Sequence, residues 1–157
     1  MKIKHLILHC TATPEGREVS AADIRKWHMS PPPAGRGWSR VGYTDIIHLD
    51  GSLENLTPYD SDDDIEAWEL TNGATGLNSI SRHIVYAGGT DKQGKAKDTR
   101  TAEQLKTMAT YCHFMVLRYP DILIAGHNQF AAKACPSFNT VDWLTSIGIP
   151  EKNIYKK

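Results

Sequence analysis

Three short apolar runs constrain the fold of this chain more than any other feature, because each has the length of a buried strand. They are residues 2–10 (KIKHLILHC), 81–89 (SRHIVYAGG) and 121–126 (DILIAG). A further run, GYTDIIHLD at 42–50, ends in Asp50 and Gly51. This dipeptide predicts a tight hairpin into a short strand near Leu53. The chain is therefore expected to build a β-sheet from these segments.

The clearest helix is expected over residues 101–118. Thr101 and Gln104 have the spacing of a capping box, and Pro120 ends the segment. Apolar residues recur within it at the i, i+3, i+4, i+7 spacing of one helix face. This apolar stripe consists of Leu105, Met108, Ala109, Cys112, Val116 and Tyr119.

Two shorter helices complete the expected fold. Ser20 and Asp23 form a second capping box, which predicts a helix over residues 21–29. Another helix is expected over 140–147, where Gly148 closes it. Strands that alternate with helices, together with one hairpin, predict an α/β (mixed α+β) fold. Its central mixed sheet would be flanked by about three helices.

The composition fits one globular domain, and no repeat or linker divides residues 1–157. The 18 basic and 18 acidic side chains give a formal net charge of zero, so we expect no nucleic-acid partner. The apolar run near the N-terminus is too short for a signal peptide or a membrane span, which predicts synthesis in the cytoplasm and no membrane partner. Three cysteines, an odd number, argue against a disulfide framework. We expect a monomer.

Seven histidines are available, at positions 5, 9, 28, 48, 83, 113 and 127. Two of them, at 28 and 113, lie in expected helices, outside or beside the apolar residues. Those at 5, 48 and 83 lie within expected strands, where a half-buried imidazole bonded to the backbone is the common arrangement. His9 and His127 differ, because each lies where a strand gives way to a loop. Since strand ends are where a sheet presents functional groups, these two are the candidate functional imidazoles.

Cys135 lies in the segment AGHNQFAAKACPSF, which has no apolar periodicity. With His9 and His127 it would supply two imidazoles and one thiolate, a donor set for a catalytic zinc site. The spacing leaves a second interpretation open, in which Cys135 and a histidine form a nucleophilic pair. Cys10 and Cys112 are expected to be small core residues.

Two further side chains near these residues are candidates for catalysis. Lys133 precedes Cys135 by two residues, and in an extended loop both would point to the same side. Its charge could then stabilise an oxyanion, although a solvated surface position is the usual fate of a lysine. Tyr43 follows Gly42 at the start of a predicted strand. It is either an ordinary strand aromatic or a phenol directed at the attacking water.

With these pieces assembled, the chain resembles the type 2 N-acetylmuramoyl-L-alanine amidases. This zinc amidase family includes amidase-type phage lysozymes and shares its fold with peptidoglycan recognition proteins. The matching segments run in the family's order over nearly the whole chain. They are HLILHCTAT, GWSRVGYTDIIHLDG, GATGLNSIS followed by YAGG, TAEQLKTM, GHNQF and KACPSF. KACPSF after a histidine is the most specific of them.

The resemblance implies a reaction and a role for each site residue. By position, His9, His127 and Cys135 correspond to the family's ligands of Zn²⁺. Tyr43 and Lys133 correspond to its catalytic residues. The implied reaction is hydrolysis of the amide between the lactyl group of N-acetylmuramic acid and L-alanine of the peptidoglycan stem peptide. An endolysin-like enzyme of this kind would be bacteriolytic, and would act on the cell wall after release or export by another factor.

The chain departs from the family pattern in three places. Phage amidases tend to have G-Y-H-F where this chain has GYTD at 42–45, S-H-A where it has NGA at 72–74, and S-I-G where it has SRH at 81–83. We expect these changes to alter the substrate groove but to touch no ligand. Two alternatives stay open: a non-catalytic peptidoglycan-binding module on the same fold, and a hydrolase with Cys135 as nucleophile.

Overall fold

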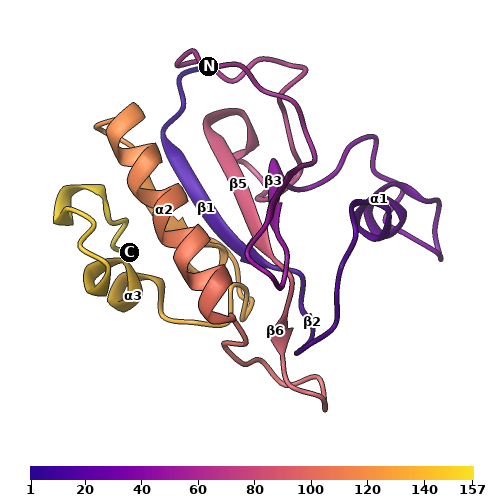
Figure 1. Ribbon diagram of the computed structural model, residues 1–157. Helices are drawn as coiled ribbons and strands as arrows, with labels where there is room; N and C mark the ends of the chain where they lie inside the picture. Colours follow the sequence, from indigo (N-terminus) through magenta and orange to yellow (C-terminus); the bar gives the residue numbers. More distant parts are fainter.

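A five-stranded sheet forms the middle layer of the fold in a computed structural model that describes residues 1–157 (Figure 1). In spatial order its strands are β4 (Leu53–Asn55), β3 (Asp45–Ile47), β5 (Ser81–Tyr86), β1 (His5–Cys10) and β7 (Leu123–Gly126). All neighbouring strands are parallel except β3 and β4, which form the antiparallel hairpin predicted at Asp50 and Gly51. The expected mixed sheet is confirmed.

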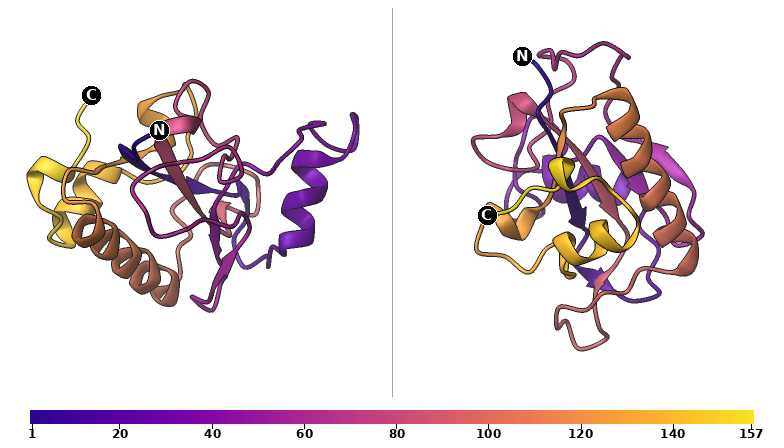
Figure 2. Two further views of the ribbon diagram at one scale, coloured as in Figure 1. Left: turned by 90° about the horizontal axis from the view of Figure 1, so that it is seen from above. Right: turned by 90° about the vertical axis from the view of Figure 1, so that its left-hand side faces the viewer.

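Helices cover both faces of this sheet. The helices α2 (Ala102–Arg118) and α3 (Thr140–Ser146) lie on one side, and α1 (Ala21–Met29) lies on the other (Figure 2). Parallel strands require crossover connections, and α1 lies between β1 and β3 in the chain as α2 does between β5 and β7. The capping boxes predicted at Ser20 and Thr101 are both formed.

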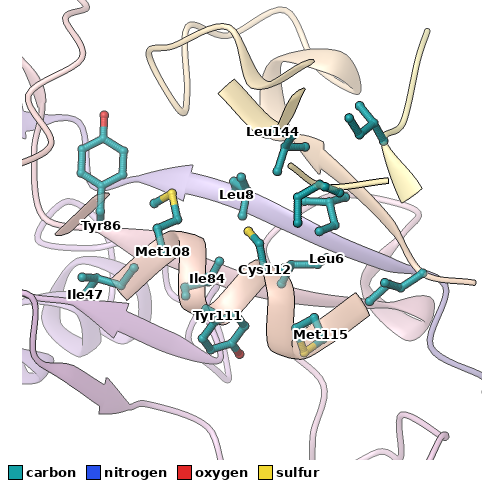
Figure 3. Packing of buried hydrophobic residues seen from close by; sticks show 14 of the residues in the cluster. Leu6, Leu8, Ile47, Ile84, Tyr86, Met108, Tyr111, Cys112, Met115 and Leu144 are labelled. Atoms are coloured by element: carbon teal, nitrogen blue, oxygen red, sulfur yellow. The ribbon is translucent and has the colours of Figure 1, made fainter. Parts of the chain in front are cut away.

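Side chains that alternate along each strand divide the core into two clusters. On the α2 side the larger cluster includes Leu6, Leu8 and Cys112 (Figure 3). On the α1 side the smaller cluster includes Ile24 and Val85. A polar side chain on the α1 face of β1 or β5 is therefore enclosed between the sheet and the segments that cover it.

The buried face of α2 is rotated relative to the predicted stripe. Its buried residues are Gln104, Met108, Tyr111, Cys112 and Met115, whereas Leu105, Ala109 and Val116 are only partly buried. The Gln104 amide donates hydrogen bonds to the carbonyls of Ile47 and Ala87, at 3.3 and 3.0 Å. The Tyr111 hydroxyl donates to Asp45 at 2.7 Å. A stripe drawn from apolar residues alone misses polar core members whose hydrogen bonds are satisfied.

A second, two-stranded sheet is not predicted by the sequence patterns. It pairs β2 (Thr13–Pro14) with β6 (Gly89–Thr90) in parallel. These strands follow β1 and β5 closely in the chain, so the parallel pairing of β1 with β5 continues beyond their C-terminal ends. No helix of the protein has the length and apolar character that a membrane crossing requires.

Candidate functional site

His9 lies near the C-terminal end of β1, on the face opposite Leu8 and Cys10. Its side chain is buried, with only 1% of the residue exposed. Its Nε2 lies 2.9 Å from Nδ1 of His83, and its Nδ1 lies 3.7 Å from Sγ of Cys135. The ring is therefore held between a second imidazole on one side and a thiol on the other.

His127 follows directly after β7, the edge strand that pairs with β1 on the side away from β5. The parallel register pairs Gly126 with Leu8, so the next residue along each strand is a histidine, His127 and His9 respectively. The two rings lie 4.7 Å apart between centroids. The Gln129 side chain accepts a hydrogen bond from the Gly126 N–H at 2.8 Å and donates one to the Tyr155 carbonyl at 2.9 Å. These bonds hold the turn that carries His127.

The loop that follows β7 brings Cys135 back to the C-terminal end of β1. The Asn128 N–H donates to the Cys135 carbonyl at 2.7 Å, and the Cys10 N–H donates to the Cys135 sulfur at 3.3 Å. The Tyr86 hydroxyl donates to the next carbonyl, that of Pro136, at 2.8 Å. Contacts from two strands thus fix the thiol beside the imidazoles.

The three candidate ligands form one cluster whose size suits a metal ion. The donor atoms of His9, His127 and Cys135 all lie within 4.8 Å of one another. Zinc–nitrogen bonds of about 2.0–2.1 Å and zinc–sulfur bonds of about 2.3 Å place ligand atoms roughly 3.3–3.8 Å apart in a tetrahedral site. The 3.7 Å between His9 Nδ1 and Cys135 Sγ lies in this range. The donor set therefore fits zinc with one coordination position left for substrate or water.

Burial and nearby charges keep both imidazoles neutral, the form that binds a metal ion. Burial and the neighbouring His83 hold the pKa of His9 well below its usual value. Burial and the charge of Lys133 lower the pKa of His127. A hydrogen bond with the neighbouring Cys10 thiol, together with burial, raises the pKa of the third candidate ligand, the Cys135 thiol. Metal binding here would therefore release a proton from the thiol.

A largely polar cavity of about 200 Å³ is lined by both imidazoles, His9 and His127, together with Tyr43 and Lys133. The Tyr43 ring lies 5.2 Å from that of His9. Burial and the nearby Cys135 thiol raise the pKa of the Tyr43 phenol. The phenol therefore stays protonated at neutral pH and can donate a hydrogen bond into the cavity.

Lys133 lines this cavity, but not for the reason that its spacing suggested. The loop is not extended here, because the Lys133 N–H donates to the Ala131 carbonyl at 2.8 Å and the Ser137 N–H donates to the Ala134 carbonyl at 2.7 Å. Cys135 does not line the cavity with it. Turns, rather than strand-like alternation, place the exposed Lys133 close enough for its charge to lower the pKa of both imidazoles.

His28 is part of the cavity wall, which its position in a helix did not predict. Its Nδ1 accepts a hydrogen bond from the Gly42 N–H at 3.0 Å. Its ring lies 5.2 Å from that of Tyr43 and 5.0 Å from that of Trp38. Burial and the nearby Arg36 lower its pKa to about 4. No motif marks this role, because it arises only when α1 packs over the sheet.

His83 also belongs to the site, and two expectations about it are wrong. It is not half-buried and bonded to the backbone, but fully buried with its imidazole against His9. It lies in one of the segments that depart from the family pattern, and the expectation that these touch no ligand is wrong. Gly73, in a second such segment, lines the cavity and packs against His83.

The fold and the cluster together define a class, an α/β protein with a candidate metal centre of two histidines and one cysteine. The family model described as N-acetylmuramoyl-L-alanine amidase matches residues 1–138 of the chain. The endolysin of Enterobacteria phage K11 is 31% identical over 137 residues, which cover 87% of this chain and 82% of that protein. The chain therefore belongs to the N-acetylmuramoyl-L-alanine amidase family, and it is a peptidoglycan amidase.

Solved structures show the same fold at low sequence identity. The amidase LysC from Clostridium intestinale aligns with a TM-score of 0.72 and 18% identity, over 95% of this chain and 87% of that one. Bumblebee PGRP-SA aligns with a TM-score of 0.66 and 22% identity, over 92% of this chain and 81% of that one. At these identities the likeness establishes the shared fold and nothing further.

Proposed function

We propose that this chain is a zinc-dependent amidase, which hydrolyses the amide between the lactyl group of N-acetylmuramic acid and L-alanine of the stem peptide. The observation that carries the proposal is the convergence of the donor atoms of His9, His127 and Cys135 within 4.8 Å in a chain of the amidase family. We assign these three residues as the ligands of Zn²⁺. We further propose that residues 1–157 act as one amidase domain, as a monomer, on peptidoglycan alone.

Bound zinc would supply a Lewis acid that polarises the scissile carbonyl and lowers the pKa of a water molecule to about 7. Two neutral imidazoles and one thiolate leave the site with a net charge of about +1, so it remains electrophilic. His9 and His127 line the cavity, whereas Cys135 does not. A muropeptide carbonyl would therefore approach from the imidazole side.

Lys133 and Tyr43 would supply the remaining polar groups. An amide has a poor leaving group, so the tetrahedral oxyanion must be stabilised before the carbon–nitrogen bond breaks. The ammonium of Lys133 would provide positive charge for this oxyanion. The protonated phenol of Tyr43 would orient the attacking water by a hydrogen bond, since its raised pKa leaves almost no phenolate to act as a base at neutral pH.

Replacing Lys133 by alanine should lower kcat about 10- to 100-fold while KM and zinc content stay nearly unchanged, because the charge acts only as the oxyanion forms. The Lys133 side chain is exposed, so the loss should be smaller than for a buried donor. Steady-state kinetics on a defined muropeptide give both constants. Lys152→Ala removes an exposed lysine outside the cavity and is the matched control. A raised KM with unchanged kcat would contradict this role.

Mass spectrometry of digested peptidoglycan tests the reaction itself. The proposed amidase releases stem peptides that begin with the free amine of L-alanine, and it leaves the glycosidic bonds intact. Sugar fragments that still carry peptide would exclude the proposal. A non-catalytic binding module would sediment with peptidoglycan but release no peptide, so the same digest separates the two functions.

We also propose an endolysin-like role in the cell, because the curated relatives are endolysins of phages. The protein would be made in the cytoplasm and would reach the cell wall after release or export by another factor. Added to chloroform-permeabilised Gram-negative cells, the purified protein should lower their turbidity. Intact cells, whose outer membrane shields the wall, are the control.

A further inference from the structure

His83 is a fully buried imidazole in β5, the central strand of the sheet. Its carbonyl accepts a hydrogen bond from the Thr44 N–H at 2.8 Å, and its own N–H donates to Thr44 Oγ1 at 3.3 Å. In its side chain, Nδ1 of His83 lies 2.9 Å from Nε2 of His9. The other ring nitrogen, Nε2 of His83, has no hydrogen-bond partner. Buried polar atoms are normally satisfied, so core packing alone does not account for a histidine here.

The contact between His83 and His9 decides which nitrogen of His9 faces the candidate ligands. Nδ1 of His9 lies 3.7 Å from Sγ of Cys135, whereas Nε2 points to His83. A neutral imidazole that binds a metal ion through Nδ1 carries its proton on Nε2. That N–H then donates to Nδ1 of His83. Such hydrogen bonds set the tautomer and the ring orientation of metal ligands.

Gly73 leaves the space in which the His83 ring lies. A Cβ at position 73 would lie 2.3 Å from Nδ1 and 2.5 Å from Cγ of His83, and 2.7 Å from the Gly42 carbonyl oxygen. Backbone on one side and His9 on the other therefore confine the ring. A side chain at position 73 would have to displace the His83 ring from His9 and would also crowd the Gly42 carbonyl.

The three departures from the family pattern form one contiguous unit around this ring. Thr44 binds the backbone of His83, and Gly73 packs against its imidazole. Where the pattern has histidine in S-H-A and glycine in S-I-G, this chain has glycine at 73 and histidine at 83. The two residue types are exchanged between facing segments, and the histidine at 83 needs the space that the glycine at 73 leaves.

We propose that His83 is a positioning residue of the metal centre. It accepts a hydrogen bond from Nε2–H of His9, presents Nδ1 of His9 as the ligand atom, and depends on Gly73 for its place. This inference rests on the proposed zinc site. It adds to that site a residue that touches neither substrate nor metal ion.

Replacing His83 by leucine, which has a similar volume and no acceptor, should weaken zinc binding by about 10- to 100-fold. His83→Asn, whose Oδ1 can take the place of Nδ1, should recover most of the affinity. Competition with a chromophoric chelator measures the affinity. The visible spectrum of the cobalt-substituted protein reports the ligand geometry, and it should change in His83→Leu and return toward that of the unaltered protein in His83→Asn.

His5→Leu removes a histidine of β1 outside the cavity and controls for general destabilisation. If His83→Leu lowers thermal stability but leaves the zinc affinity and the cobalt spectrum unchanged, His83 is only a core residue and the inference is wrong. If the unaltered protein itself binds no zinc, the proposed function fails as well. The two failures are therefore distinguishable.

A double-mutant cycle tests the pairing of His83 with Gly73 even if His83→Leu does not fold. Gly73→Ala should weaken zinc binding by about tenfold or more, because its Cβ displaces the His83 ring. The same substitution in a His83→Ala background should cost clearly less, since no ring remains to be displaced and only the Gly42 carbonyl is crowded. Additive losses would show that the two positions are independent and would overturn the inference.

Discussion

A Cys135→Ser variant should bind zinc at least about 100-fold more weakly, and its kcat/KM should fall about 10³-fold or more. A serine hydroxyl stays protonated near neutral pH and is a poor zinc ligand, so the site would keep only two imidazoles. The fold should survive, because the Asn128 N–H bonds the Cys135 carbonyl, and a serine hydroxyl can still accept the hydrogen bond that the Cys10 N–H donates to the sulfur. Zinc content after gel filtration and hydrolysis of a defined muropeptide measure the two losses.

Cys112→Ala is the matched control, because it removes a buried thiol on the opposite face of the sheet. This variant should lose stability but keep zinc and turnover. Chelation followed by zinc readdition tests the remaining interpretation, in which Cys135 is a nucleophile rather than a zinc ligand. If the unaltered enzyme keeps its activity without metal while Cys135→Ser loses it, Cys135 is a nucleophile and the zinc proposal is wrong.

Local signals in the sequence predicted most of the fold. The capping boxes at Ser20 and Thr101 lie within four residues, and the helix begins directly after each. The hairpin at Asp50 and Gly51 is equally local. Such features depend on backbone geometry over a few residues, and distant packing does not change them. The buried face of α2 was less predictable, since Gln104 enters the core only because strand ends lie opposite to accept its hydrogen bonds.

The candidate ligands were predictable because strand ends have a fixed place in a parallel sheet. His9 is the penultimate residue of β1 and His127 follows β7, and adjacent parallel strands bring their C-terminal ends together. Cys135 required the family resemblance, because the turns that return its loop to the sheet leave no periodic signal. Lys133 shows the limit of reasoning from spacing alone. It lines the cavity, but the extended loop from which its position was predicted does not exist.

The residues that support the ligands could not be read from the sequence. Gly73 and His83 meet across a loop and a strand, and their contact depends on the register of β5 against β1. His28 reaches the cavity only because α1 packs against this face. The ligand motif therefore predicts the chemistry, whereas the departures from the family pattern predict where the surroundings of the ligands have been rebuilt.

Replacing Tyr43 by phenylalanine should lower kcat about 10²- to 10³-fold with zinc content unchanged. The substitution keeps the ring, which packs 5.2 Å from those of His9 and His28, and removes only the hydroxyl. Because burial raises the pKa of the phenol, it remains a hydrogen-bond donor throughout the neutral pH range. The lost donor should therefore affect turnover, measured with a defined muropeptide, much more than binding of substrate or metal.

Tyr111→Phe is the matched control for this prediction. Its hydroxyl bonds Asp45 at 2.7 Å outside the cavity, so its loss should lower the free energy of unfolding without changing kcat. A Tyr43→Phe enzyme that turns over at the unaltered rate would show that the water is oriented by other groups. A variant that loses zinc together with activity would instead assign Tyr43 to the support of the metal site, because orienting water requires the metal to be bound while the phenol acts.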